Sequence, residues 1–364
     1  MATRCSDSGS EKLGQYAREI RGEWSLGPAA ALDRIVPELG DDKHKGQLGR
    51  VGVFGGSEDY TGAPFFASIS ALRTGADLAL VFTAEEAAPA LKAYSPELMV
   101  TPVYSAATLS RSGTGTAETG GDGPAGVDGS GRRRRPRDDN DNDNDNDNGD
   151  DYSALAQPII ENVARFLPRL HSLLLGPGMG RHPVVRQAAA GMVLRARERG
   201  TPVVLDADAI RAVVESPEAV RGFALAVLTP NANEFRLLCE KMAEEEGGGE
   251  VGSAADSGGR PPRQEVSSPP SGGGPAGAGA EAVATAAAAA AAATAAVRSE
   301  EERGKAAEVE RLARHLGGVT VVLKGKVDII SDGTRTVACA VPGGLKRCGG
   351  IGDVLSGTMA TALA

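Results

Sequence analysis

The chain has 364 residues, a formal net charge of −9 and aromatic residues at only 4% of its positions. It also contains 49 glycines and 21 prolines, so much of it has too little apolar surface to form a core. The acidic balance, with no basic face at helical or strand spacing, argues against nucleic acid and against an anionic membrane surface as partners. We expect the ligands to be small molecules.

The cysteines and the N-terminus indicate an intracellular, soluble protein. Cys5, Cys239, Cys339 and Cys348 form no C-x-x-C pair, which argues against a zinc site and a disulfide framework. No secretory signal and no strongly apolar stretch of about 18 residues is present. We expect a cytoplasmic protein, with the mitochondrion or the plastid as alternatives, because the first 22 residues hold three arginines, one lysine and several serines.

Apolar runs that alternate with helical stretches predict the fold class. After a flexible segment over residues 1–28, we expect a single catalytic domain over residues 29–364. Several of its predicted strands are apolar on both faces, as buried parallel strands are. The pattern therefore predicts an α/β sandwich with a mainly parallel sheet. The predicted strands cover residues 50–56, 77–83, 97–104, 172–178, 202–208, 226–231, 320–330 and 336–341.

Two low-complexity segments interrupt this domain. Residues 107–151 run through Gly, Ser and Thr to RRRRPR and a series of Asp-Asn repeats, and residues 244–303 contain Ser/Pro/Gly tracts and an alanine run. Neither segment offers enough apolar surface to offset the entropy of ordering it. We expect both to be disordered surface insertions.

The chain resumes with a helix and a hairpin after the second insertion. Apolar residues at 309, 312, 313 and 316 have helical spacing, and Gly317 and Gly318 are expected to end the helix. Further on, KVDII and RTVACA flank the turn SDGT, which predicts a β-hairpin with Asp332 and Gly333 at its turn.

Polar and glycine-rich clusters follow five of the predicted strands. They are FGGSEDYTGA, LGPGMGR, LDADAI, LTPNANEF and LKGKVD. Open α/β sheets bind ligands at the carboxyl ends of their parallel strands, so these loops predict one site. LGPGMGR followed by Asp206 also imitates a dinucleotide-binding fingerprint. Its G-x-G-x-G spacing and the distance to Asp206 argue against a Rossmann oxidoreductase.

The motif RCGGIGDVLSG, residues 347–357, predicts an anion site with an acid beside it. Gly349, Gly350 and Gly352 allow backbone amides to converge on a phosphate at the start of the following helix. Asp353 then has two interpretations. It is either the N-cap of that helix, or a base that takes the proton from a hydroxyl as this oxygen attacks a γ-phosphate.

Taken together, the motifs resemble the ATP-dependent NAD(P)H-hydrate dehydratases of the ribokinase-like superfamily. The resemblance covers roughly residues 44–104, 152–238 and 319–364. It is carried by KHKGQLGRVGVFGG, DYTGAP, ISALRTGADLALVF, KAYSPEL, GPGMGR, VLDADAI, LTPNANEF, LKGKVDII and RCGGIGDVLSG.

This resemblance implies a ribokinase-like three-layer sandwich and a lyase that consumes ATP. Such enzymes phosphorylate the hydroxyl of the S-epimer of NADH hydrate or NADPH hydrate and eliminate phosphate. The products are NADH or NADPH, ADP and inorganic phosphate. A separate NAD(P)H-hydrate epimerase is implied as a functional partner, because only about 28 residues precede the core of this chain.

The resemblance also implies roles for individual residues. Asp353 is the implied catalytic base and contacts the hydrate. Tyr60, Thr61 and Gly62 are expected near the nicotinamide. The other implied hydrate contacts are Gly180, Asn231, Ala232, Asn233, Glu234, Phe235, Arg236 and Leu237. The implied ATP contacts are Lys324, Gly325, Lys326, Val327, Asp328, Gly343, Gly344, Leu345, Lys346, Arg347, Cys348, Gly349, Gly350, Ile351 and Gly352.

Several interpretations stay open at this point. Glu234 is a candidate to position Mg²⁺ through water, or is an ordinary acid at a helix start. Lys324 offers its ammonium group to a phosphate, or is a surface lysine. Cys348 is expected to be a buried thiol. The chain ends partway along the helix that begins at Asp353, so we expect a domain truncated at its C-terminus.

Two other functions share the fold. A kinase that phosphorylates a small alcohol or vitamin precursor would use the same glycine-aspartate loop, and a nucleotide-binding module without catalysis would keep only the anion site. The motifs KHKGQ, KAYSPEL and NANEF favour the dehydratase over the kinase, whereas the missing C-terminus keeps the binding module open as an alternative.

Overall fold

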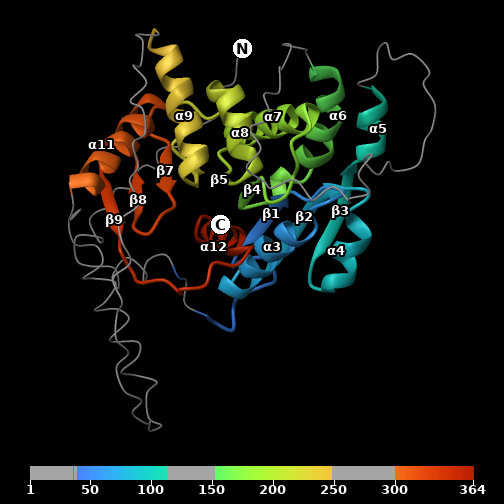
Figure 1. Ribbon diagram of the computed structural model, residues 1–364. Helices are drawn as coiled ribbons and strands as arrows, with labels where there is room; N and C mark the ends of the chain where they lie inside the picture. Colours follow the sequence, from blue (N-terminus) through green and yellow to red (C-terminus); the bar gives the residue numbers. More distant parts are fainter. Residues whose placement is uncertain (1–35, 37–38, 113–151, 248–299) are drawn as a thin grey trace, which may run out of the picture.

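The computed structural model describes residues 36, 39–112, 152–247 and 300–364, and these build a single nine-stranded sheet (Figure 1). The strand order is β3-β2-β1-β4-β5-β6-β7-β8-β9, with parallel pairing from β3 to β7 and antiparallel pairing beyond it. The strands are β1 (Arg50–Phe54), β2 (Leu78–Ala84), β3 (Met99–Tyr104), β4 (Ser172–Leu175), β5 (Val203–Leu205), β6 (Ala226–Leu228), β7 (Thr320–Leu323), β8 (Asp328–Ser331) and β9 (Thr336–Cys339).

Helices cover both faces of the sheet, which gives the three layers of an α/β sandwich (Figure 1). One face carries α3 (Gly62–Thr74), α4 (Ala88–Tyr94) and α12 (Ile351–Ala362). The other carries α5 (Ala106–Ser112), α6 (Ser153–Ala164), α7 (Pro183–Arg199), α8 (Asp208–Glu215), α9 (Ala232–Glu245) and α11 (Glu300–His315). Short 3₁₀ turns lie at Leu167–Arg169 and Pro217–Ala219. Among the described residues, no helix is long and apolar enough to cross a membrane.

The buried strands divide their side chains between the two helical layers. Val51 and Val53 of β1 are fully buried and pack with Ala67 of α3 and Ala360 of α12. Phe54 directly follows Val53, so its side chain lies on the opposite face of the sheet and packs into the larger core there. Apolar residues on both faces are what a strand needs when helices cover both, which explains the near-continuous apolar runs in the sequence.

The strand order brings the five predicted loops to one edge. Strands β1, β4, β5, β6 and β7 are parallel neighbours, so the loop after each leaves from the same side of the sheet. Backbone bonds join adjacent loops: the Asp206 amide donates to the Leu175 carbonyl, and the Lys324 amide donates to the Pro230 carbonyl. The prediction of one shared edge is confirmed.

The predicted strand over residues 320–330 is wrong as a continuous element. β7 and β8 are antiparallel neighbours separated by a reversal at residues 324–327. The Gly325 amide donates to Asp328 Oδ1 at 2.8 Å, which closes this reversal. The following hairpin of β8 and β9 is confirmed.

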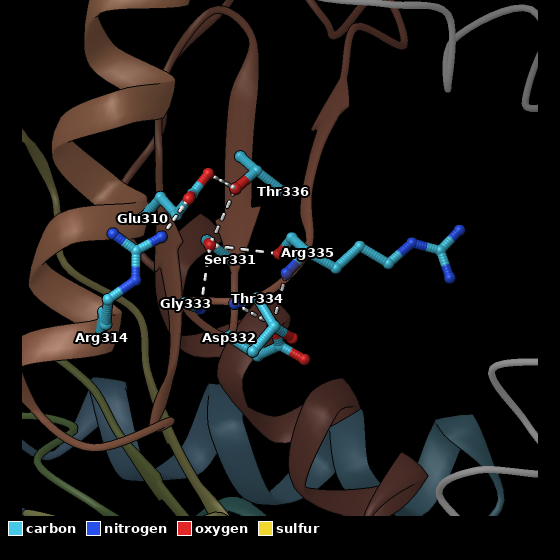
Figure 2. Close-up of polar contacts among 8 residues, drawn as sticks. All are labelled: Glu310, Arg314, Ser331, Asp332, Gly333, Thr334, Arg335 and Thr336. Carbon is cyan, nitrogen blue, oxygen red and sulfur yellow. Dashed lines mark hydrogen bonds and ion pairs between the residues drawn. The ribbon is translucent and has the colours of Figure 1, made fainter.

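Figure 2 shows how the turn of this hairpin is held. Asp332 Oδ1 accepts hydrogen bonds from the Thr334 and Arg335 amides at 2.8 and 2.7 Å. The Thr336 hydroxyl donates to Glu310 Oε2 of α11 at 3.0 Å, so the hairpin is anchored to the helix beside it (Figure 2). Gly333 has a φ of 82°, the left-handed conformation expected at such a turn.

The edges of the two expected insertions need correction. Residues 107–112 belong to α5, α9 continues to Glu245, and α11 begins at Glu300. α5 forms because Glu86 caps its first turn: the carboxylate accepts from the Ala106 and Ala107 amides at 3.1 and 3.2 Å. Such a cap comes from a distant residue and leaves no local signal. The rest of both insertions, residues 113–151 and 248–299, lies outside the described residues, as do residues 1–28.

Helices α3 and α12 pack in close contact through a glycine. A methyl group added to Gly357 would lie 2.0 Å from the Ala67 carbonyl oxygen and 2.3 Å from Ser70 Oγ. No side chain fits there without moving one helix. Gly304 in α11 differs, because nothing lies within 4 Å of an added methyl group.

We expect Gly357→Ala to lower the free energy of unfolding by about 1–3 kcal/mol through overpacking. The control Gly304→Ala, in an exposed helical position, should raise it by about 0.5–1 kcal/mol because alanine costs less backbone entropy than glycine. Urea unfolding of both variants measures the two changes. Equal effects would contradict the close packing of α3 on α12.

Candidate active site

A buried ion pair occupies the centre of the carboxyl edge. Asp206, directly after β5, is only 1% exposed, and its Oδ1 lies 2.6 Å from the ammonium group of Lys324 after β7. The hydroxyl of Thr229, which follows the intervening strand β6, donates to the same oxygen at 2.8 Å. Side chains from the ends of three adjacent strands therefore meet at one carboxylate.

A second carboxylate, two residues further on, holds the loop after β4. Asp208 Oδ2 accepts a hydrogen bond from the Gly180 amide at 2.9 Å. Burial raises the pKa of Asp208, against the lowering effects of this hydrogen bond and of Arg181. The residue between the two acids, Ala207, has φ 48° and ψ −122°, a conformation that a side chain strains.

The first turn of α12 lies against the ion pair. Gly350, with φ 88°, is the N-cap residue, and Asp353 is the third residue of the helix. A methyl group added to Gly352 would lie 3.6 Å from Lys324 Nζ and 3.8 Å from Asp206 Oδ2. The N-cap is Gly350 and not Asp353, because the turn into the helix needs the left-handed conformation that glycine adopts at little cost.

Burial, together with the charges of Asp206 and Asp208, raises the pKa of Asp353 to about 6 against the lowering effect of Lys324. The carboxylate is thus less hydrated and more basic than an exposed aspartate. A pKa close to neutral suits a group that must accept a proton and release it again.

Glu234 faces the same cluster from the start of α9. It forms a capping box with Asn231: Glu234 Oε2 accepts from the Asn231 amide at 2.7 Å, and Asn231 Oδ1 accepts from the Glu234 amide at 3.0 Å. Burial raises the pKa of Glu234 to about 6, which the Asn231 bond and Lys324 partly offset. The interpretation of Glu234 as an acid at a helix start is confirmed. Within the described ranges, no group of three His, Cys, Asp or Glu side chains is arranged to hold a metal ion.

The other expected hydrate contacts differ in their exposure to solvent. Asn231, Ala232 and Asn233 are exposed at the start of α9. Phe235 is 7% exposed and belongs to the core, and Arg236 pairs with Glu240 along the helix at 2.5 Å. Leu237 is partly buried on the same helix. The start of the run, Asn231 to Asn233, is therefore exposed at the sheet edge beside Glu234, whereas Arg236 is exposed further along the helix.

The expected ATP contacts fall into two groups. Lys324 to Val327 form the reversal between β7 and β8, where Gly325 and Lys326 are exposed, and Asp328 begins β8. Residues 343–349 belong to a long irregular connection between β9 and α12, and all of them are exposed (Figure 1). Cys348 is exposed, so the expectation of a buried thiol is wrong. Ile351 and Gly352 form the first turn of α12, beside Lys324.

The loop after β1 packs against the glycine loop after β4. A methyl group added to Gly178 would lie 2.8 Å from Tyr60 Cβ, so the two loops touch. The Thr61 hydroxyl lies 2.9 Å from the Tyr94 hydroxyl of α4, and Gly62 begins α3. These contacts keep the first loop at the same edge as Gly180.

Asp206 and Asp208 are the site residues that the sequence did not assign. The motif LDADAI predicts a loop at the ligand edge, but the sequence assigns its acids no function, since its spacing argues against a dinucleotide fingerprint. The signal that could have found them is two acids flanking a small residue directly after a buried strand, at the edge where ligands bind. Their partners, Lys324 and Gly180, lie 118 and 28 residues away.

Comparison with known proteins agrees with this architecture. The family model for NAD(P)H-hydrate dehydratase matches residues 51–118, 150–256 and 288–364. A Neurospora crassa protein named ATP-dependent (S)-NAD(P)H-hydrate dehydratase is 37% identical over 336 residues, which cover 92% of this chain and 74% of that protein. A Danio rerio protein of the same name is 32% identical over 357 residues, 96% of this chain and 77% of that protein.

Among solved structures, the chain is similar to a ribokinase-like superfamily protein from Enterococcus faecalis. The TM-score is 0.51 at 16% sequence identity, with 90% of this chain and 75% of that chain covered. At this identity the likeness establishes the ribokinase-like fold and nothing about ligands.

Asp353→Asn should change how stability depends on pH. The pKa of Asp353 rises from an ordinary 3.8 to about 6 on folding, so stability is lost as pH rises through this window. The variant removes this loss. Its free energy of unfolding, relative to that of the unchanged protein, should rise between about pH 4 and pH 6 and then level off. Urea unfolding at several pH values measures the difference, and a flat or falling difference would contradict the raised pKa.

Proposed function

The chain belongs to the NAD(P)H-hydrate dehydratase family, and we propose that it uses ATP to dehydrate the S-epimer of NADH hydrate and NADPH hydrate. The products are NADH or NADPH, ADP and inorganic phosphate, so the enzyme is a lyase that repairs damaged nicotinamide nucleotides. The relatives' name supports the S-epimer and the use of ATP.

One observation carries the mechanism: Asp353 is a partly buried acid with a pKa of about 6 in the first turn of a helix, beside the ammonium group of Lys324. The helix N-terminus and the ammonium group attract phosphate, whereas a carboxylate repels it. An acid at this place is therefore explained if it acts on the hydroxyl that attacks the phosphate.

ATP is proposed to bind across the reversal at residues 324–328 and the connection at residues 343–352. Both segments are close to the N-terminus of α12, and the exposed backbone of residues 343–349 is accessible to a nucleotide. The hydrate is proposed to bind on the other side of the ion pair, against Gly180 and the start of α9 from Asn231 to Glu234. Asp353 interacts electrostatically with Lys324 and with Asp208, which supports a place for this base between the two proposed regions.

Mg²⁺ is proposed as the cofactor that accompanies ATP. Mg²⁺ commonly uses one or two carboxylates together with phosphate oxygens and water. Glu234 fits this role through a water molecule, because its carboxylate is partly buried beside the cluster and belongs to the element that begins at the ligand edge. The ion would neutralise negative charge on the phosphates.

The reaction then proceeds in two steps whose atoms balance. Asp353 accepts the proton of the hydrate hydroxyl as this oxygen forms a bond to the γ-phosphorus, and the bond to the β-phosphate oxygen breaks to release ADP. The carbon–oxygen bond of the phosphorylated hydrate breaks next, driven by the ring nitrogen's electron pair. Phosphate leaves, and the adjacent ring carbon loses a proton, which restores the dihydronicotinamide.

A separate epimerase is proposed as the functional partner. An enzyme restricted to the S-epimer leaves the R-epimer unrepaired unless another activity interconverts the two. Addition of an NAD(P)H-hydrate epimerase to a reaction on mixed epimers should therefore raise the final yield of NADH from part of the hydrate to nearly all of it.

The direct test incubates the protein with ATP, Mg²⁺ and NADH hydrate and follows NADH absorbance together with ADP. Equal amounts of NADH and ADP support the dehydratase. ADP formed only with another alcohol as acceptor would support a kinase instead. ATP binding without turnover of any acceptor would support a binding module.

Asp353→Asn should lower kcat by roughly 10² to 10⁴ while the Kd for ATP changes little, because general-base catalysis is lost and the anion site is kept. The unchanged enzyme should lose activity as pH falls through about 6, where Asp353 becomes protonated. Glu234→Gln is the matched control, and it should leave this acid limb in place. Near-normal turnover of Asp353→Asn would contradict the assignment.

A further inference from the structure

Asp206 and Asp208 extend from one short segment toward two different loops. Asp206 Oδ1 binds the ammonium group of Lys324 at 2.6 Å, and Asp208 Oδ2 accepts from the Gly180 amide at 2.9 Å. The first loop is in the proposed nucleotide region and the second is in the proposed hydrate region. A single residue, Ala207, separates the two acids.

We propose that residues 206–208 are a positioning device that fixes the two substrate-binding loops relative to each other, with Asp206 holding Lys324 for ATP and Asp208 holding Gly180 for the hydrate. This inference rests on the proposed function. Neither acid is a catalytic residue in it, because each acts through the group that it holds.

The strained backbone at Ala207 supports this role. Ala207, between the two carboxylates that contact separate loops, has a φ of 48°. A strained backbone conformation persists where the surrounding structure enforces it. The neighbours that enforce it are known: both flanking acids have fixed partners, and the Ala209 amide donates to the Asp206 carbonyl at 3.1 Å.

The loop from Gly176 to Gly180 packs directly against residues 206–208. A methyl group added to Gly176 would lie 1.8 Å from the Asp206 carbonyl oxygen and 2.9 Å from the Ala209 amide nitrogen. The backbones of the two loops therefore pack without an intervening side chain. A shift of residues 206–208 must move the Gly176–Gly180 loop, and the reverse also holds.

The Asp206–Lys324 ion pair is the second contact of the device. We call this ion pair the nucleotide arm and the bond between Asp208 and the Gly180 amide the hydrate arm. Asp206 is 1% exposed and the Lys324 side chain is 21% exposed, so the carboxylate is fixed and the lysine reaches it from the surface. Thr229 holds the carboxylate from the other side at 2.8 Å. Lys324 is thereby kept beside Gly352 in the first turn of α12, instead of extending into solvent.

The hydrate arm is tested with Asp208→Ala and Asp208→Asn. Asp208→Ala removes the acceptor, and the KM for NADH hydrate should rise about tenfold or more, since a hydrogen bond to a charged group is lost. The KM for ATP should stay within about twofold. Asp208→Asn keeps an acceptor oxygen and should recover most of the loss. Equal rises in both KM values, or no rise, would overturn this arm.

The nucleotide arm is tested with Asp206→Asn, which keeps the shape of the side chain and its oxygen for Thr229. Without the charge that anchors Lys324, the Kd for ATP and the KM for ATP should both rise about tenfold. The KM for NADH hydrate should change by less than about twofold. A lower Kd for ATP would show that Asp206 restrains Lys324 from phosphate, and would overturn this arm.

Ala207→Gly tests the connection between the arms. Glycine adopts the same φ without strain, so the melting temperature should be unchanged or higher by about 2–4 °C. The looser backbone should lower kcat by about tenfold with both loops intact. The control Glu198→Gln removes an exposed carboxylate near the end of α7, at the opposite edge of the sheet, and should leave both KM values unchanged. Unchanged kcat in Ala207→Gly would overturn the connection.

Failure of this inference and failure of the proposed function are distinguishable. If the unchanged protein binds ATP but does not convert NADH hydrate, the proposed function fails, and the Kd for ATP of Asp206→Asn still tests the nucleotide arm. If the unchanged protein is active and the KM values do not separate between the Asp206 and Asp208 variants, the proposed function stands and the positioning device is rejected.

Discussion

The bond between Asp206 and Lys324 is the constraint on which the site depends. It joins the ends of β5 and β7, which are two strands apart in the sheet, across the end of β6. Burying a carboxylate is costly unless a charge and hydrogen bonds compensate it, and Lys324 and Thr229 provide both. Because the same lysine lies beside the first turn of α12, the pair also sets where this helix begins relative to the sheet.

The charge balance around this pair explains the properties of the other acids. Asp206, Asp208, Glu234 and Asp353 share one neighbourhood, and Lys324 is the cation that lowers the pKa of both Glu234 and Asp353. Burial and mutual repulsion prevail over that attraction, so both acids have pKa values near 6. The protein thus gives up stability at neutral pH to keep a basic carboxylate in the first turn of α12.

The topology explains how the chain accommodates two long low-complexity segments. Residues 113–151 connect α5 to α6, and residues 248–299 lie between α9 and α11. Neither segment directly follows one of the five strands whose loops form the site. Additional chain length between two helices costs little entropy of loop closure and leaves the register of the sheet unchanged.

The sequence by itself determined the parallel α/β sandwich, the five loops at one edge and the family. Apolar runs, glycines and acids at strand ends are local patterns that need no knowledge of distant contacts. Tertiary structure alone decided that Gly350 and not Asp353 is the N-cap, that Phe235 belongs to the core, and that Asp206 meets Lys324. These outcomes depend on strand order and helix packing, which bring together residues such as Asp206 and Lys324, 118 positions apart, and set each acid's burial.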